Sequence, residues 1–251
     1  MLKKRIIPIQ LISKGRLVKT KNFSNPRDVG DPVMSSKVYS SQDADELLLL
    51  HIDKFDESID VLVDTVEKIS KECFVPFSVG GGINSIRDAE RLFFAGADKI
   101  VLNTVTHSNP KVIREISDIA GIQAVVVCID VKLIDQEYLI FSKNNKIEKK
   151  ITLQDQIEKV IDFGAGEIII QSIDRDGEMI GYDLNLLKLV NSLSSVPVIA
   201  AGGAGNFQDL RHAFEIGVSA VACGSLFNFG DNNPLRAKAF LKNYKVPLKL
   251  I

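Results

Sequence analysis

Gly81-Gly82-Ile83-Asn84-Ser85-Ile86-Arg87-Asp88 and Gly202-Gly203-Ala204-Gly205-Asn206-Phe207-Gln208-Asp209 are two versions of one segment, 121 residues apart in the chain. The correspondence continues without a gap beyond both segments, so that Phe93 falls on Phe214 and Thr104 on Ser225. A repeat of about half the chain is too long for a solenoid, whose units are about 20–50 residues. The sequence therefore predicts two homologous halves, about 1–122 and 123–251, within one domain that spans 1–251.

Short and almost continuously apolar runs alternate with amphipathic stretches along the chain. Such runs are typical of parallel strands that are covered on both faces. The predicted strands are Ile6–Leu11, Leu47–Ile52, Phe77–Val79, Lys99–Leu102, Ala124–Asp130, Glu167–Ile173, Val198–Ala201 and Ala220–Gly224. The predicted helices include Ser58–Lys71, Ser85–Phe94, Pro110–Ile119, Leu153–Phe163 and Asn206–Ile216. Eight strands alternating with helices in about 250 residues are typical of a (β/α)8 TIM barrel, an α/β fold. A doubly wound open sheet fits less well, because it would give the two halves unlike edges.

Two longer segments interrupt this alternation, Lys14–Val33 after the first predicted strand and Val131–Lys150 after the fifth. We expect both to be irregular insertions. The repeat pairs them, and both follow strands. They should therefore lie at the C-terminal end of the barrel, where TIM barrels carry their active sites.

The composition suits one globular domain with a substantial core, since 45% of the 251 residues are hydrophobic and 25% are charged. A net charge of −1 gives no indication of a nucleic-acid or anionic-membrane partner. The three cysteines, Cys73, Cys128 and Cys223, lie in apolar surroundings without metal-ligand spacing, which favours buried, reduced thiols. The apolar start of the chain is too short, and too interrupted by Pro8 and Gln10, for a signal peptide. We expect a soluble, cytoplasmic protein without a metal site or a cofactor.

The two glycine segments predict a pair of phosphate sites. After a barrel strand, a glycine-rich turn exposes backbone N–H groups that can bind an anion at the start of a helix. Glycines that merely turn the chain would explain one such segment. Two matched copies, each followed at the same spacing by a hydroxyl residue, favour phosphate and predict an elongated ligand with a phosphate at each end. The candidate ligands are Gly81, Gly82, Asn103 and Thr104 in the first half, and Gly202, Gly203, Gly224 and Ser225 in the second, with Asp176 and Gly177 beside the second site.

Charged residues at the starts of predicted strands predict a second feature, at the opposite end of the barrel. Arg5, Glu46, Lys99 and Glu167 open or directly precede four strands, and their formal charges sum to zero. Because buried charges persist only when they are paired, a closed ring of ion pairs is one interpretation. The ring could be a stabilising plug or a set of exposed strand ends, or it could gate a narrow passage along the barrel axis.

Several motifs together carry a resemblance to a known family. They are Lys4-Arg5-Ile6-Ile7-Pro8, Gly30-Asp31-Pro32, Gly80-Gly81-Gly82-Ile83, Ala124–Asp130, Ser172-Ile173-Asp174-Arg175-Asp176-Gly177 and Gly202-Gly203-Ala204-Gly205. With these motifs, which extend over nearly the whole chain, the sequence resembles the synthase (cyclase) subunit of imidazole glycerol phosphate synthase, known as HisF. The resemblance implies a duplicated half-barrel that binds a substrate with two phosphates. It also implies that ammonia passes through the barrel from a docked glutaminase.

The resemblance assigns roles to individual residues. It implies that Asp130 is a catalytic aspartate and that Lys19 lies on a mobile loop over the active site. It places the face around Asp98 against a HisH-like glutaminase in a heterodimer. It assigns the ammonia gate to the four strand-start residues Arg5, Glu46, Lys99 and Glu167.

Three positions depart from the pattern of the family. The family uses two aspartates as acid and base, one at the end of each half's first strand, and the counterpart of Asp130 falls at Leu11. Leucine cannot exchange a proton, and loss of such a group typically costs about 10²–10⁴-fold in rate. His51 stands where the family usually has an aspartate, and Ala201 where it usually has a serine. A lone histidine such as His51 is more often a packed or surface residue than a catalyst.

These departures leave three functions open. A subgroup of HisF-like proteins, associated with lipopolysaccharide or flagellin glycan modification, resembles the chain better. This subgroup implies a barrel that passes ammonia, or a product of it, to a separate sugar amidotransferase making acetamidino sugars. The alternative is a working cyclase in histidine biosynthesis. A third reading is a non-catalytic conduit for ammonia, which would have no need of two phosphate turns.

Overall fold

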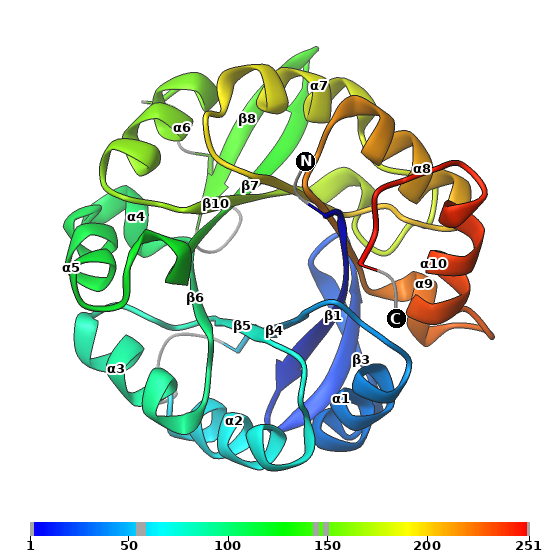
Figure 1. The fold of residues 1–251 in the computed structure, drawn as a ribbon. Coiled ribbons are helices and arrows are strands. Elements are labelled where there is room, and N and C mark those ends of the chain that lie inside the picture. The colour runs from blue at the N-terminus through cyan, green and yellow to red at the C-terminus, as the bar shows by residue number, and fades with distance from the viewer. Residues whose placement is uncertain (1–2, 54–58, 143–145, 148–150, 250–251) are drawn as a thin grey trace.

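The computed structural model describes residues 3–53, 59–142, 146–147 and 151–249. Within this part of the chain, eight parallel strands close into a barrel, and helices surround it (Figure 1). These strands are β1 (Arg5–Ser13), β4 (Leu47–His51), β5 (Phe77–Gly80), β6 (Lys99–Leu102), β7 (Val125–Ile134), β10 (Glu167–Ser172), β11 (Val198–Ala201) and β12 (Ala220–Cys223). The predicted (β/α)8 TIM barrel is confirmed.

The barrel closes because its first strand pairs with its last. Strand β1 lies between β12 and β4, with Arg5 opposite Ala220 and Ile9 opposite Leu48. Strand β7, the first strand of the predicted second half, pairs with β6 on one side and with β10 on the other. All of these pairings are parallel, so the C-terminal ends of the strands gather at one mouth.

The helices cover the outside of the barrel. They are α1 (Pro32–Ser41), α2 (Asp60–Glu72), α3 (Ile86–Ala95), α4 (Val105–Ser108), α5 (Lys111–Ala120), α6 (Leu153–Asp162), α7 (Leu184–Leu193), α8 (Phe207–Ile216), α9 (Ser225–Asn228) and α10 (Pro234–Lys242). Short 3-10 turns, η1 (Ile122–Ala124) and η3 (Ile173–Arg175), complete the loops. The repeated segments behave alike, since α3 and α8 both begin with a capping box and both end at a left-handed glycine, Gly96 or Gly217.

The two segments predicted to be irregular are β-hairpins instead. Strand β1 continues through a turn at Lys14 and Gly15 into β2 (Arg16–Lys21), which pairs with β3 (Ser24–Gly30). Strand β7 likewise turns at Asp135 and Gln136 into β8 (Glu137–Ser142), followed by β9 (Lys146–Ile147). The residues of both turns have positive φ, the geometry that suits a two-residue hairpin. Of the second predicted insertion, residues 143–145 and 148–150 lie outside the described residues.

Predicted element ends differ from the observed ones by a few residues at most, apart from β7. Strand β7 runs four residues past its predicted end at Asp130, because it continues into the hairpin. The prediction for the second helix began at residue 58, which lies outside the described residues, whereas α2 begins at Asp60. No helix in the described ranges is long and apolar enough to cross a bilayer.

The core has two parts. The larger lies between the strands and the helices, and the smaller fills the barrel interior. The interior residues are apolar, and several of them are small. They are Ile7, Ile9, Leu48, Val101, Val126, Cys128, Ile169, Ile199, Ala201, Ala220 and Ala222. The three cysteines are free and buried, as predicted.

Candidate active site

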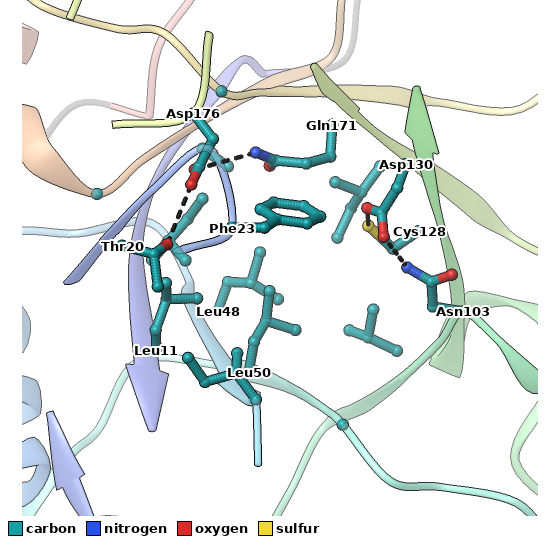
Figure 2. Close-up of a pocket in the computed structure, with 18 of the residues that line it drawn as sticks. Leu11, Thr20, Phe23, Leu48, Leu50, Asn103, Cys128, Asp130, Gln171 and Asp176 are labelled. Atoms are coloured by element: carbon teal, nitrogen blue, oxygen red, sulfur yellow. Dashed lines mark hydrogen bonds between the residues drawn. The ribbon is translucent and has the colours of Figure 1, made fainter. Parts of the chain in front are cut away.

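A cavity of about 430 Å³ opens at the C-terminal ends of the strands (Figure 2). Strands of both halves and both hairpins contribute to its wall. It gathers the predicted catalytic residue and the predicted ligand residues, which line it together: Lys19, Gly81, Gly82, Asn103, Thr104, Asp130, Asp176, Gly177, Gly202, Gly203, Gly224 and Ser225. Their roles in binding and catalysis remain predictions.

The two glycine turns are held by close backbone contacts that exclude a side chain. Gly81 has a φ of 105°, and a Cβ atom there would collide with the carbonyl oxygen of His51. Gly202 has a φ of 86°, and its Cβ would meet the carbonyl oxygen of Ser172. His51 and Ser172 are themselves separated by the repeat distance of 121 residues. The same backbone geometry is therefore built twice, on opposite sides of the mouth.

Both glycine turns offer backbone N–H groups to an anion. At the starts of the following helices, the Ser85 side chain caps the N–H of Asp88 in α3, and the Asn206 side chain caps those of Gln208 and Asp209 in α8. By contrast, the N–H groups of Gly82 and Gly203 donate no hydrogen bond within the described residues. Free N–H groups in a concave glycine turn are suited to bind a phosphate oxygen.

Asp130 lies between the two turns, on the wall contributed by the second half. One carboxylate oxygen accepts a hydrogen bond of 2.8 Å from Asn103 Nδ2, and the other lies 3.6 Å from the Cys128 sulfur (Figure 2). Burial raises the pKa of Asp130 to about 6, and the negative charge of Asp176 contributes to this increase. The hydrogen bonds from Asn103 and Cys128 act in the opposite direction and lower the pKa. A carboxyl group with such a pKa can both accept and donate a proton near neutral pH.

Lys19 reaches the same cavity from β2. Its Nζ donates a hydrogen bond of 2.9 Å to the carbonyl oxygen of Ile9, and Gly224 leaves it room, since a Cβ there would collide with that Nζ. Burial lowers the pKa of Lys19 to about 8, although Asp176 opposes this shift. The amine thus lies beside the second glycine site with a pKa near neutrality.

Asp176 connects the first hairpin to the mouth. Its carboxylate accepts hydrogen bonds from Thr20 Oγ1 at 3.1 Å and from Gln171 Nε2 at 3.2 Å. Its backbone carbonyl accepts another, from Asn22 N at 2.9 Å. These contacts hold the β2–β3 hairpin against the second half.

Leu11 occupies the position in the first half that Asp130 occupies in the second. Leu11 pairs with Leu50 across the β1–β4 ladder, and Asp130 pairs with Gln171 across the β7–β10 ladder. Leu50 and Gln171 are again 121 residues apart. Leu11, Leu48 and Leu50 form an apolar group on one side of the cavity in Figure 2, whereas Asp130, Gln171 and Asp176 make the other side polar.

Several further residues line the cavity that were not predicted from the sequence. Phe23 projects its ring into the middle of the mouth from the tip of the β2–β3 hairpin (Figure 2). No sequence signal pointed to it, since the hairpin itself was not predicted. Gln171 and Cys128 could have been found, because their positions in strands fix which face they present.

At the opposite end of the barrel, the four strand-start residues form a closed ring of ion pairs. Arg5 contacts Glu46 at 2.7 Å and Glu167 at 2.9 Å, and Lys99 contacts the same two carboxylates at 3.0 and 3.2 Å. Ser78 Oγ donates a further hydrogen bond of 2.5 Å to Glu46. Each cation thus bridges both anions, with little exposure of any of the four side chains. Whether the ring gates a passage stays a prediction.

Asp98 lies at this same end, just before β6. It is exposed, and one of its carboxylate oxygens accepts a hydrogen bond of 2.9 Å from Phe77 N. The predicted gate and the predicted partner face therefore share one end of the barrel, away from the cavity. Within the described residues, no three His, Cys, Asp or Glu side chains are grouped as metal ligands would be.

Comparison with known proteins gives consistent similarities. A family model described as "Histidine biosynthesis protein" matches residues 5–233. The imidazole glycerol phosphate synthase subunit HisF of Thermotoga sp. (strain RQ2) is 41% identical over 250 residues, covering 100% of this chain and 99% of the relative. HisF of Chloroherpeton thalassium is 41% identical over 251 residues, covering both chains fully. A putative HisF of Leptospira interrogans is 41% identical over 247 residues, covering 97% of this chain and 96% of the relative.

Proposed function

Because this chain belongs to the HisF family of histidine biosynthesis proteins, we propose that it is the ammonia-using subunit of an imidazole glycerol phosphate synthase. In this reaction the phosphoribosyl formimino ribotide reacts with ammonia. The products are imidazole glycerol phosphate and the aminoimidazole carboxamide ribotide. The observation that carries the proposal is the pair of matched glycine turns, facing one cavity with Asp130 between them.

The two turns would bind the two phosphates of the ribotide. Each offers backbone N–H groups from a glycine that no side chain obstructs, and Thr104 and Ser225 add a hydroxyl group at equivalent positions. Lys19 adds a positive charge next to Gly224. A substrate held at both ends has its reacting centre fixed over Asp130, and such positioning accounts for a large part of enzymatic rate enhancement.

Asp130 would carry out the proton transfers at that centre. With a pKa of about 6, it is mostly ionised at neutral pH and acts first as a base. Its hydrogen bond from Asn103 fixes one oxygen and leaves the other directed at the thiol of Cys128, a weak donor. Proton transfer from a positioned group of this kind is worth about 10²–10⁴-fold in rate.

Ammonia would reach the cavity along the barrel axis from a glutaminase subunit. The ion-pair ring lies where such a passage would begin, next to the exposed Asp98, which we assign to the partner interface. Above the ring, the interior is lined by apolar side chains such as Val126, Ile199 and Ala222. Uncharged ammonia crosses an apolar lining far more easily than ammonium, whose burial is costly.

One observation favours a second candidate function. The first half offers Leu11, Leu48 and Leu50 on the side of the cavity where a second acid or base would lie opposite Asp130. A barrel that passes ammonia onward, for acetamidino-sugar formation by a separate sugar amidotransferase, would retain the ring and the phosphate turns without the paired acid and base. Full-length similarity to HisF subunits favours the histidine reading over this one.

The test is a cyclase assay on the purified protein, with ammonium as the nitrogen source and the phosphoribosyl formimino ribotide as substrate. We expect turnover by the unmodified protein, an increase in kcat of about tenfold or more for Leu11→Asp, and a loss of at least about 10²-fold for Asp130→Asn. Absence of turnover in the unmodified protein, with turnover in Leu11→Asp, would instead support the acetamidino-sugar candidate. Absence in both would reject a cyclase.

A further inference from the structure

Gln171 lies in the layer of the barrel interior that is nearest the mouth. Side chains alternate along β10, so that Ile169 belongs to the interior cluster and Ile170 packs between the strands and the helices. Gln171 therefore points to the same side as Ile169, and it is 8% exposed and lines the cavity. Its ladder partners are Asp130 on one side and Ala201 on the other. The side chain thus lies between the proposed acid-base group and the start of the second glycine turn.

The amide of Gln171 is oriented by Asp176. Its Nε2 donates a hydrogen bond of 3.2 Å to Asp176 Oδ1, and Figure 2 shows the side chain between Asp176 and Asp130. Gly202 leaves room for this amide, since a Cβ there would lie 3.0 Å from Nε2. A primary amide has two N–H groups and a carbonyl oxygen, and Asp176 takes one of the N–H groups. The side chain therefore has a further donor and an acceptor at the cavity wall, below the second glycine turn.

The equivalent position in the first half is apolar. Leu50 lies 121 residues before Gln171 and pairs with Leu11 in the ladder. Its Cδ2 would lie 3.0 Å from a Cβ at Gly80, so the leucine packs directly below the first glycine turn. Leucine offers no hydrogen bond to a ligand, whereas the amide offers both a donor and an acceptor. The two ends of one elongated ligand would therefore meet different side-chain chemistry next to similar backbone turns.

The contact with Asp176 does not by itself account for the amide. Burial raises the pKa of Asp176, and the hydrogen bond from Thr20 and the charge of Lys19 oppose this increase most strongly. The backbone N–H of Phe23 comes next, and the hydrogen bond from Gln171 contributes less than these. The carboxylate of Asp176 thus has several partners besides the glutamine.

We propose that Gln171 is a specificity-determining residue that contacts the substrate, by hydrogen-bonding a hydroxyl group of the sugar phosphate held at the second glycine turn. The inference rests on the proposed function and deepens it, because it assigns a ligand class to this turn: a phosphate on a hydroxylated carbon chain. A hydroxyl group both donates and accepts, so it can pair with either end of the amide. A ligand without that hydroxyl group is disfavoured, because it leaves the amide unpaired in a largely buried place.

Site-resolved binding tests this preference. The probes are ribose 5-phosphate and n-pentyl phosphate, which carry a phosphate on five carbons with and without hydroxyl groups. The backbone amide signals of Gly203 and Gly82, followed by NMR during titration, report the second and the first turn separately. At Gly203 we expect the wild type to prefer ribose 5-phosphate by about tenfold and Gln171→Met by about threefold or less. The preference at Gly82 should be the same in both proteins, and it is the internal control.

The possible outcomes separate the inference from the proposed function. An unchanged preference at Gly203 in Gln171→Met would overturn the inference, and so would an equal loss of affinity for both probes, which a structural role predicts. If ribose 5-phosphate shifts neither amide signal in the wild type, the phosphate turns of the proposed function fail and the inference fails with them. Gln171→Asn, whose amide is one methylene group shorter, should show the same loss of preference and replaces Gln171→Met if that variant does not fold.

Kinetics provide a second readout. A contact with the sugar phosphate is made in the ground state as well as in the transition state. Gln171→Met should therefore raise KM for the ribotide about tenfold and change kcat less than about threefold. A fall in kcat without an increase in KM would mean that Gln171 acts by positioning Asp130 or Asp176, and it would overturn the proposal.

Discussion

Replacing Asp130 by asparagine should make the protein more stable and less active at neutral pH. In the folded protein, burial raises the pKa of Asp130 from an ordinary 3.8 to about 6. The folded state therefore binds this proton more tightly than the unfolded state does. Stability falls as the pH rises from about 4 to about 6 and then remains lower, because the ionised carboxylate disfavours folding. Asparagine keeps the size and the acceptor for Asn103 without the charge.

The magnitude follows from the shift in pKa. At 1.36 kcal/mol for each pKa unit, the change from 3.8 to about 6 corresponds to a cost of about 3 kcal/mol above pH 6. Because the cavity admits water to Asp130, we expect about half of this, or 1–2 kcal/mol. In a chain of this size, such a gain raises Tm by about 3–6 °C.

The assay compares guanidinium unfolding of the wild type and Asp130→Asn at about pH 7.5 and about pH 4, without ligand. The variant should be more stable at the higher pH, and most of the difference should disappear at the lower one, where Asp130 is protonated in the folded state and nearly half protonated in the unfolded state. Two results would refute this reasoning. One is equal stability of the wild type and Asp130→Asn at pH 7.5, and the other is an undiminished stability advantage of Asp130→Asn at pH 4.

Two further predictions concern the ring and the glycine turns. Arg5→Ala should change glutamine-driven turnover of the complex and spare turnover with ammonium if the ring is a gate; equal losses in both assays would make the ring structural. Gly82→Ala should weaken the binding of a sugar bisphosphate about tenfold, measured by calorimetry, because the new methyl group lies at the phosphate turn and the φ of 74° costs about 1 kcal/mol. Gly30→Ala, also at a positive φ but with open space around it and outside the cavity, is the matched control and should leave binding unchanged.

The barrel strands could be predicted because both faces of each strand are buried. Nearly all residues of such a strand are therefore apolar and form a continuous run in the sequence. Lys99–Leu102 and Val198–Ala201 were predicted with the observed bounds for this reason. The hairpins could not be recognised in the same way, because β3 is largely exposed and reads as a polar loop. Its turn also uses Asn22 and Phe23 at positive φ, without the Asn-Gly or Asp-Gly pair that usually indicates a hairpin.

Two helices could have been predicted from the sequence. Asp31-Pro32 and Asn233-Pro234 each place a capping side chain before a proline, and α1 and α10 begin at those prolines. Their apolar faces are weak, since Met34, Val38 and Leu235 are exposed, and periodicity alone therefore gave no signal. In these two helices, the capping residue and proline at the start are a stronger signal than the apolar periodicity of the residues that follow.

In the candidate site, features that depend on the backbone could be predicted, whereas contacts between side chains could not. Glycine pairs with a fixed spacing identify the phosphate turns, because the collisions that a Cβ would cause at Gly81 and Gly202 are set by the backbone. The network of His51 with Asp53, Ser13 and Lys14 joins the C-terminal ends of β1 and β4, and only the folded chain brings those strand ends together.

The phosphate turns constrain which ligands bind, but they do not determine which reaction follows. The turns bind through backbone N–H groups, so they fit any ligand with phosphates at the right separation, whatever reaction occurs between them. The reaction depends on side chains at interior positions of β1, β4, β7 and β10, where Leu11 faces a half that contains Asp130. A duplicated barrel can therefore keep the same hold on its ligand while the two halves change their chemistry independently. Substitutions at Leu11 and Asp130 probe what this chain does with its ligand, whereas substitutions at the glycines probe only whether the ligand binds.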